Sequence, residues 1–302
     1  MDLKFWHSKP EILKNWIDTL RQFQSLLKRA AIPSVYLLLG ALPIEAELHK
    51  RQLSFLYILL SAENVKFKRI IERQLCENFD TKDSFFYRII EVLFMYNLPS
   101  ILHLQKNLPK KLQWKKMIMT SISSYWNELL LNQAHSTMSS LKYLSKDNLR
   151  IGNPHSIYRT VKPSIMDVRK CMIKTCMVTR TYTLQADRHK FNRYEVEPLF
   201  QLCNIESEDL PHMLTTCVTF VDIRNALYIP IKHRVINLIG PRKWNEMFNN
   251  RLSITKLILD CSNFTEELGN QQNIDEIETL CRNYSYKLHN KILEVVKMVA
   301  DT

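Results

Sequence analysis

Glycine is scarce in this chain, with only 4 residues in 302. We therefore expect neither the phosphate-binding loops nor the tight β-hairpins for which glycine supplies the backbone freedom. Neither Gly-x-Gly-x-x-Gly nor Gly-x-x-x-x-Gly-Lys occurs, which excludes the common nucleotide-binding fingerprints. The 7 cysteines are few and scattered, so a disulfide scaffold is not expected and the thiols should be reduced.

Signatures of catalysis and of membrane insertion are also missing. The sequence has no Asp-Asp dipeptide, no His-Glu-x-x-His and no Gly-x-Ser-x-Gly, so we expect no enzymatic activity and no small-molecule substrate. The longest uncharged stretch near the N-terminus, residues 31–44, contains two prolines and is too short to cross a bilayer. Residues 1–4 carry no apolar signal segment. These features predict an intracellular protein, nuclear or cytoplasmic, without a membrane partner.

The residues that are present predict a mostly α-helical, multi-helix bundle with a small Cys/His element. Hydrophobic residues make up 46% of the chain, and in several stretches they recur every three or four positions. The expected helices cover residues 11–27, 44–61, 65–79, 84–96, 112–131, 164–178 and 274–299. Ser84 is placed to cap one of them, and Pro163 suits the first turn of another. Only residues 182–184 and 194–196 resemble strands.

The turn sequence Gly152-Asn153-Pro154 is the best candidate for a domain boundary. It predicts a helical region over residues 1–150 and a basic helical region over residues 151–302. The second region would hold the Cys/His element, residues 200–217, and a long C-terminal helix. The apolar stripe of that helix should pack on a partner, and helix-mediated self-association is one possibility.

The charge is strongly positive and unevenly distributed. The chain has 42 basic and 30 acidic residues, a formal net charge of +12. Residues 142–193 hold twelve basic and three acidic side chains, which accounts for nine of that surplus. A second run, residues 106–116, has five lysines and no acid. Both runs suit solvated helix faces, and together they equally suit a surface for a polyanion, with nucleic acid before the anionic membrane surface.

One local motif points to a metal ion. Cys203, His212 and Cys217 are spaced as Cys-x8-His-x4-Cys, and thiolates with an imidazole are typical ligands of Zn²⁺. A closed zinc site needs four ligands, and Phe200 stands where a Cys-x2-Cys pair would supply the fourth. His189, Asp209 or a water could replace it. The alternative is a small cluster of buried cysteines with a capping histidine.

Several stretches, taken in order, resemble a known family. They are Leu42–Leu53, Leu112–Lys115, Tyr125-Trp126, Asp167–Lys170, Thr179–Arg188, Phe191–Arg193 and the Cys203–Cys217 block. Their order resembles the C-terminal portion of the reverse transcriptases of non-LTR (LINE-type) retrotransposons, of the kind abundant in invertebrates and especially molluscs. The resemblance covers residues 30–225.

The resemblance implies thumb-like and linker helices followed by a Cys-Cys-His-Cys zinc-binding element. It maps Cys203, His212 and Cys217 onto three zinc ligands, and Phe200 replaces the first cysteine. Loss of that ligand implies either an open coordination position or no site. The family's catalytic palm and its endonuclease have no counterpart here, so the resemblance implies a truncated, non-catalytic fragment.

We therefore expect a non-catalytic protein that contacts the backbone of RNA or DNA, with zinc as its cofactor. Such contacts give affinity without reading sequence. The side chains expected to carry them are Lys162, Arg169, Lys170, Lys174, Arg180, Arg188, Lys190 and Arg193. The alternative is a helical protein-interaction module, or a relic that does not bind nucleic acid.

Overall fold

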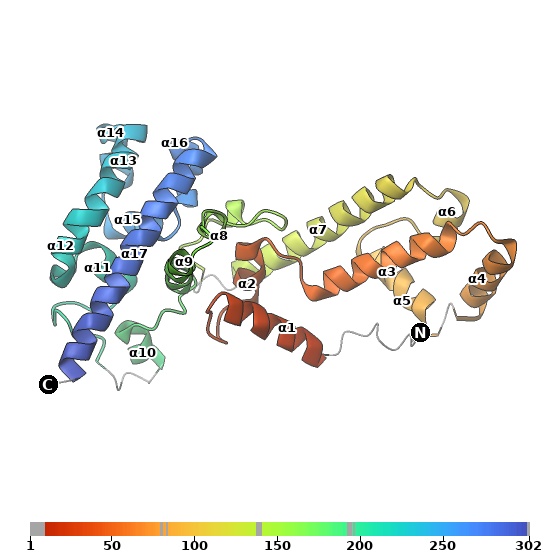
Figure 1. The fold of residues 1–302 in the computed structure, drawn as a ribbon, viewed down its shortest axis with the longest axis horizontal. Helices are drawn as coiled ribbons and strands as arrows, with labels where there is room; N and C mark the ends of the chain where they lie inside the picture. Colours follow the sequence, from red (N-terminus) through yellow and green to blue (C-terminus); the bar gives the residue numbers. More distant parts are fainter. Residues whose placement is uncertain are drawn as a thin grey trace. The chain divides into compact units, whose positions relative to one another are not determined.

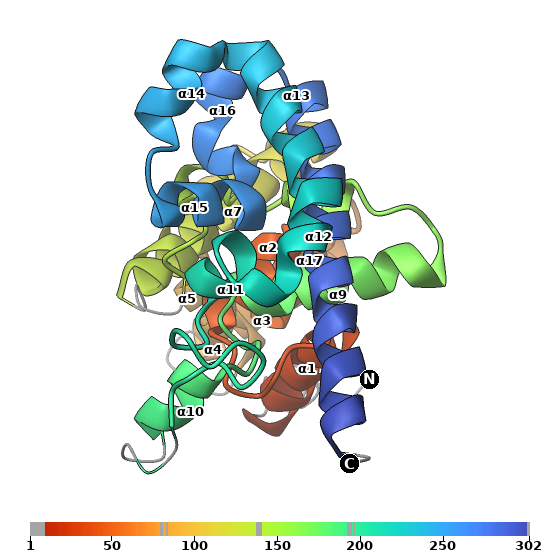
Figure 2. The same ribbon diagram turned by 90° about the vertical axis from the view of Figure 1, so that its left-hand side faces the viewer.

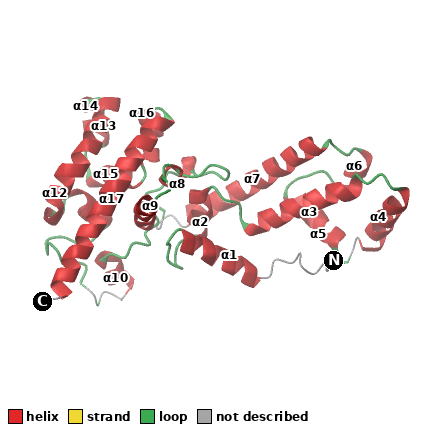
Figure 3. Ribbon diagram, viewed as in Figure 1, coloured by secondary structure: helices red, strands yellow, loops and turns green. Residues whose placement is uncertain are grey.

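The structure, a computed structural model, describes residues 10–78, 81–82, 84–136, 141–191, 195 and 197–300. The described residues form a mostly helical protein without a β-sheet (Figures 1 and 3), which confirms the predicted fold class. Two isolated β-bridges, Arg150 with Asn153 and Leu199 with Ser207, are the only strand-like pairings in these ranges. No helix in the described part of the chain is both long and apolar enough to cross a membrane.

The chain divides into two compact units. Unit 1 comprises residues 1–17 and 41–132, and unit 2 comprises residues 18–40 and 133–302. Helices α1 (Pro10–Phe23) and α7 (Lys111–Ser136) contribute residues to both. The other helices of unit 1 are α3 (Ile44–Leu60), α4 (Val65–Asn78), α5 (Phe85–Met95) and α6 (Ile101–Lys106).

Unit 2 contains shorter helices around one long one. They are α2 (Ile32–Leu39), η2 (Lys146–Asn148), α8 (Ser156–Arg159), α9 (Ile165–Val178), α10 (Gln185–Phe191), α11 (Leu210–Thr215), η3 (Val218–Phe220), α12 (Val221–Ile223), the π-helical turn η4 (Arg224–Tyr228), α13 (Ile229–Ile239), α14 (Pro241–Met247), α15 (Arg251–Leu259), η5 (Cys261–Phe264), α16 (Thr265–Leu268) and α17 (Gln271–Ala300). The division leaves the predicted turn at Gly152 inside unit 2.

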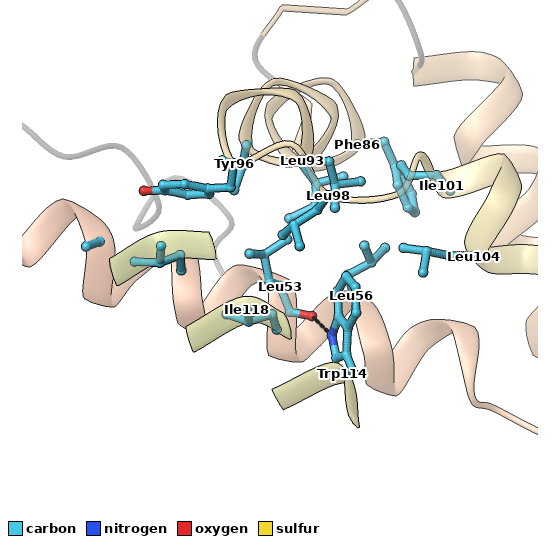
Figure 4. Packing of buried hydrophobic residues seen from close by; sticks show 14 of the residues in the cluster. Leu53, Leu56, Phe86, Leu93, Tyr96, Leu98, Ile101, Leu104, Trp114 and Ile118 are labelled. Atoms are coloured by element: carbon cyan, nitrogen blue, oxygen red, sulfur yellow. Dashed lines mark hydrogen bonds between the residues drawn. The ribbon is translucent and has the colours of Figure 1, made fainter. Parts of the chain in front are cut away.

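The core of unit 1 is almost entirely apolar. Leu53 and Leu56 of α3 pack against the buried faces of α5, α6 and α7, as Figure 4 shows. Trp114 is fully enclosed, and its indole N–H donates to the Leu53 carbonyl oxygen at 3.2 Å. This bond satisfies the one polar group that the ring brings into the core.

Serine residues cap two helices of unit 1, and the first of these caps is the one that the sequence predicts. The Ser84 hydroxyl accepts a hydrogen bond from the Tyr87 N–H at 3.1 Å and caps α5. Ser100 caps α6 in the same way, accepting from the His103 N–H at 3.3 Å. Each cap satisfies an N–H group that has no partner inside its helix.

Helix α17 is the axis of unit 2. It packs against α9, α13 and α15, and Figures 1 and 2 show α13 running beside it. Its apolar stripe, from Ile274 to Leu288, is buried. The predicted partner of this stripe is therefore the helix's own unit. Self-association of the chain stays a prediction, but deletion of residues 274–302 would remove core side chains and is not a clean test of it.

The predicted boundary turn and the predicted position of Pro163 differ in the structure. Gly152 donates its N–H to the Gly40 carbonyl oxygen at 2.8 Å, and a Cβ on Gly40 would lie 2.7 Å from the Asn153 carbonyl carbon. The expected boundary turn is therefore packed inside unit 2. Helix α9 begins after its cap Ser164, so Pro163 precedes the helix instead of opening it.

The expected strand at residues 182–184 is an irregular connection. The N–H groups of Thr181 and Tyr182 both bond to the Cys176 carbonyl oxygen and close the end of α9. These bonds occupy the donors that a strand would offer to a neighbour. The other expected strand includes residues 194 and 196, which lie outside the described residues.

Candidate metal centre and basic surface

A tight turn places the first candidate ligand. The Phe200 N–H donates to the Glu206 carbonyl oxygen at 2.9 Å, and the N–H of Cys203 returns to the Phe200 carbonyl oxygen at 3.1 Å. Asn204 follows with a positive φ of 53°, a conformation that asparagine tolerates better than most residues. The turn therefore brings the Cys203 thiol toward the residues that come after it.

Helix α11 places the other two ligands. Asp209 caps it by accepting the His212 N–H at 2.8 Å, which fixes His212 in the first turn. The N–H of Cys217 bonds back to the His212 carbonyl oxygen at 2.9 Å, just beyond the end of the helix. The ligand atoms of Cys203, His212 and Cys217 all lie within 4.8 Å of one another, so the predicted group is assembled.

The two nitrogens of His212 face different partners. Its Nε2 lies 3.3 Å from the Cys203 Sγ, inside the group. Its Nδ1 lies 3.3 Å from a Glu206 carboxylate oxygen and 3.2 Å from the Thr216 hydroxyl. A proton on Nδ1, held by Glu206, leaves the Nε2 lone pair free for a metal ion, which is the usual outer arrangement of a metal-bound histidine.

The Glu206 carboxylate is in turn bound by a residue outside the Cys/His group. Arg251 of α15 forms a two-pronged ion pair with it, with one contact at 3.2 Å, and this hydrogen bonding lowers the pKa of Glu206. The carboxylate therefore stays charged beside His212. The Cys-x8-His-x4-Cys motif does not identify Glu206 or Arg251 as part of the site. Their pairing depends on a tertiary contact, because Arg251 lies 45 positions beyond Glu206.

A buried aromatic ring packs against the imidazole of the group. Phe200 is 2% exposed, and its ring meets that of His212 edge-to-face with centroids 6.0 Å apart. Two side chains were predicted as replacements for the missing fourth ligand. Asp209 uses a carboxylate oxygen to cap α11, and His189 is not part of the metal-ligand group within the described residues. The donor chemistry fits a metal ion with three protein ligands.

Burial shifts the pKa of one thiol of this group. It raises the pKa of Cys217, and the neighbouring Cys203 adds to that increase, while the N–H and hydroxyl of Thr219 act in the opposite direction. The Cys217 thiol therefore favours its protonated form until a cation binds and displaces the proton.

The metal-ligand loop also holds α10. The N–H of Gln185 donates to the Glu208 carboxylate at 2.7 Å, and that of Ala186 donates to the Glu208 carbonyl oxygen at 3.3 Å. Two N–H groups of the first turn of α10 are thus tied to the segment between Cys203 and His212. Displacement of that segment would displace α10 with it.

The predicted phosphate-contacting residues fall into different environments. Five of the eight form no ion pair within the described ranges, and all are exposed except Lys170, which is half-buried; they are Lys162, Arg169, Lys170, Arg188 and Lys190. Arg180 is half-buried and pairs with Asp187 at 2.9 Å. Arg193 lies outside the described residues.

The prediction for Lys174 is wrong. Its side chain is fully buried in unit 2, and its ammonium group pairs with the Glu278 carboxylate at 2.7 Å. The residue lies on the inner face of α9, toward α17, so it cannot reach a phosphate at the surface. Helical position decides this: Arg169 and Lys170 belong to the same helix and remain accessible.

Lys142 belongs to the basic run of residues 142–193 but is not among the side chains predicted to contact phosphates. Burial and the nearby cations Arg180 and Lys190 lower the pKa of Lys142, while Asp209 and Asp187 oppose that effect. The structure thus gathers cations from three segments beside the metal-ligand loop. In unit 1, the five lysines of residues 106–116 are all exposed and form no ion pair within the described part of the chain.

Comparison with known proteins gives no relative from which a function could be transferred. No family model, no curated protein and no solved structure matches this chain.

Proposed function

We propose that this chain is a non-catalytic protein that binds the phosphate backbone of RNA or DNA, and that it is related to the C-terminal region of non-LTR reverse transcriptases. The sequence resemblance and the net charge of +12 support this proposal. The assembled group of Cys203, His212 and Cys217 supports it further, since these are the positions of the family's zinc ligands.

The observation that carries the proposal is the attachment of α10 to the metal-ligand loop. Arg188 and Lys190 are exposed on α10 and form no ion pair within the described residues, and the first turn of α10 is bonded to Glu208 of that loop. A fixed backbone lets flexible cationic side chains meet phosphates without first ordering the helix. The Cys/His group is then the anchor of the basic surface.

We propose Zn²⁺ as the ion of this group, in a structural role. Cys203, His212 and Cys217 would hold it, and Glu206 would orient His212 from outside. Binding to these three ligands stabilises the loop between residues 203 and 217, and through Glu208 it stabilises α10. Because Phe200 fills the place of a fourth protein ligand, we expect weaker affinity than in a four-ligand zinc site.

Charge reversal on α10 tests the nucleic-acid proposal. We expect the double variant R188E/K190E to weaken binding to a single-stranded DNA by about tenfold or more at low salt, because two phosphate contacts become repulsive. The matched control is K110E/K111E in unit 1, which changes the net charge equally. Equal weakening by both pairs would show that only total charge matters and would overturn the assignment to α10.

Ligand substitutions test the metal proposal. We expect Cys217→Ser to abolish stoichiometric binding of Zn²⁺ or of its spectroscopic substitute Co²⁺, and Phe200→Cys to tighten it by completing a four-ligand set. Isothermal titration calorimetry and the Co²⁺ absorption spectrum measure both effects. Wild-type protein that takes up neither ion would show that the group is a cluster of buried thiols with a histidine.

A further inference from the structure

Unit 1 carries an apolar groove of about 770 Å³. It lies between α4, α5 and α6. Its walls are formed by Glu72, Leu75, Cys76, Ile90, Leu93, Phe94, Leu98, Ser100, Ile101, Leu102 and Gln105. Most of these side chains are apolar, so an empty groove exposes apolar surface to water at a free-energy cost.

Helix α5, which lines the groove, has apolar residues on the side that faces the core of unit 1 and on the side that faces the groove. Figure 4 shows Phe86 and Leu93 of α5 directed into the core of unit 1. On the other side, Phe94 is 88% exposed at the lip of the groove, and Leu102 of α6 is 70% exposed beside it. Large apolar side chains this exposed, gathered along a groove, are typical of an interaction surface, so this side of α5 is expected to have a partner.

The shape of the groove favours a helix as that partner. Both α4 and α5 line it with side chains spaced three and four residues apart, Glu72, Leu75 and Cys76 on one and Ile90, Leu93 and Phe94 on the other. Such rows form the ridges into which a further helix packs. Sites for small molecules enclose most of their ligand, whereas the lips of this groove are exposed.

Most of the charged side chains at the rim that form no ion pair within the described residues are basic. Lys68 and Arg69 lie four and three residues before Glu72, on the same side of α4, and Lys106 lies four residues after Leu102 on α6. All three are exposed, and none forms an ion pair within the described residues.

Among the described residues of α4, α5 and α6, the acids other than Glu72 are already paired. Glu77 pairs with Arg73 at 2.7 Å, and Glu91 pairs with Arg88 at 3.1 Å. The rim therefore offers unpaired positive charge on either side of an apolar floor. From the groove and this rim together, we infer that unit 1 docks an amphipathic helix of another protein, whose apolar stripe fills the groove and whose flanks are acidic.

Two synthetic peptides test this inference. Each has about 18 residues, long enough to form a helix, with leucines at positions i, i+3, i+4 and i+7; one carries glutamates on its other faces and the second carries lysines there. We expect the full chain to bind the glutamate peptide, and to bind the lysine peptide at least about tenfold more weakly, as measured by fluorescence anisotropy.

Variants locate the binding. We expect F94S/L102S to weaken binding of the glutamate peptide by about tenfold or more, and K68E/R69E to reverse the preference between the two peptides. The matched control is Leu112→Ser, an equally exposed apolar residue of unit 1 that does not line the groove. It should leave binding unchanged. Because these side chains are exposed, circular dichroism should show the wild-type helix content in each variant.

Several results would overturn the inference. They are equal binding of both peptides, binding that F94S/L102S does not weaken, and no binding of either peptide at about 1 mM. Saturable uptake of a fluorescent fatty acid in place of the peptides would assign the groove to a lipid. A dimer that F94S/L102S dissociates in sedimentation, with no peptide binding, would assign it to a second copy. None of these outcomes bears on the α10 surface.

Discussion

The two units stabilise their cores by different means. Unit 1 buries apolar side chains from α3, α5, α6 and α7, with a single indole N–H satisfied by a backbone carbonyl. Unit 2 buries charges. Its core contains the pair of Lys174 with Glu278, and Asp260 lies against His155 at 3.3 Å. Both pairs have side chains at most 1% exposed.

The buried charges of unit 2 are held by hydrogen bonds and ion pairs. Asp260 accepts the Ser145 N–H at 2.7 Å and the Ser262 hydroxyl at 2.6 Å. Arg282 is also buried and reaches the Asp167 carboxylate at 3.1 Å and the Thr160 hydroxyl at 2.7 Å. Such networks add little net stability, but removal of one partner leaves a buried charge unpaired. The comparison teaches that unit 1 tolerates changes that conserve volume, whereas unit 2 also requires matched charges.

The largest effect should follow from breaking the buried pair of unit 2. We expect Lys174→Met to destabilise this unit by about 3–5 kcal/mol, because Glu278 loses its partner. The double variant K174M/E278L should recover most of that loss, since apolar residues of similar size replace both charges. Urea unfolding followed by circular dichroism measures both free energies. A single variant as stable as the wild type would contradict the account of this core.

A cavity in unit 1 should cost slightly less. We expect Leu56→Ala to destabilise unit 1 by about 2–5 kcal/mol, and Leu56→Met, which conserves volume, to cost less than about 1.5 kcal/mol. Hydrogen exchange of the α3 and α5 amides reports the change for this unit alone. Similar losses for both substitutions would show that shape, and not volume, limits this core.

Acid should weaken unit 1 before it weakens the Asp260 network of unit 2. Burial lowers the pKa of His49 to about 4, and the Tyr96 hydroxyl lies 2.7 Å from its Nδ1. Between the unfolded value near 6.5 and this folded value, the unfolded chain binds more protons, so stability falls as the pH falls. We expect a loss of roughly 2–3 kcal/mol between pH 7 and pH 4.

The control for that loss is His49→Gln, which does not titrate. Its unit 1 should show a flat stability over the same pH range, measured by urea unfolding with Trp126 fluorescence, because the Trp126 indole donates to Tyr96 at 2.9 Å. In unit 2, burial acts to raise the pKa of Asp260, but the contacts that this carboxylate makes with His155, the Ser145 N–H and Ser262 outweigh burial and lower it. The stability that depends on this carboxylate is therefore lost only as the pH falls below its unfolded value, near 3.8.

The smallest effect on stability should come from the exposed basic residues. We expect R188E/K190E to change the free energy of unfolding by less than about 0.5 kcal/mol, because neither side chain is buried or paired in the described structure. Thermal unfolding checks this. A large loss would mean that α10 needs these residues to fold, and weaker nucleic-acid binding by the variant would then have a structural cause.

The sequence predicts the helices better than their surroundings. Residues 84–96 and 274–299 coincide with α5 and α17 to within a few positions, because their caps and apolar stripes are local signals. The burial of Lys174 could not be predicted, since its partner lies 104 residues away. The same holds for the turn at Gly152, whose packing depends on Gly40.

In the candidate site too, the sequence predicts what depends on local spacing and does not predict what depends on tertiary contacts. Cys203, His212 and Cys217 lie within 15 consecutive residues, so their spacing alone predicted the group that the fold assembles. The sequence also identified Phe200 as the missing ligand, but not its edge-to-face packing on His212. The hydrogen bond from α10 to Glu208 depends on a tertiary contact, so no local sequence pattern predicts it.

The most direct test of the nucleic-acid proposal is the salt dependence of binding. The purified chain is titrated with a structured RNA and with a single-stranded DNA between about 50 and 200 mM salt. We predict that the logarithm of affinity falls linearly with the logarithm of salt concentration, and that R188E/K190E reduces this slope by about 1–2 units while K110E/K111E leaves it unchanged. Absence of binding at 50 mM salt, or equal slopes in all three proteins, would contradict the account.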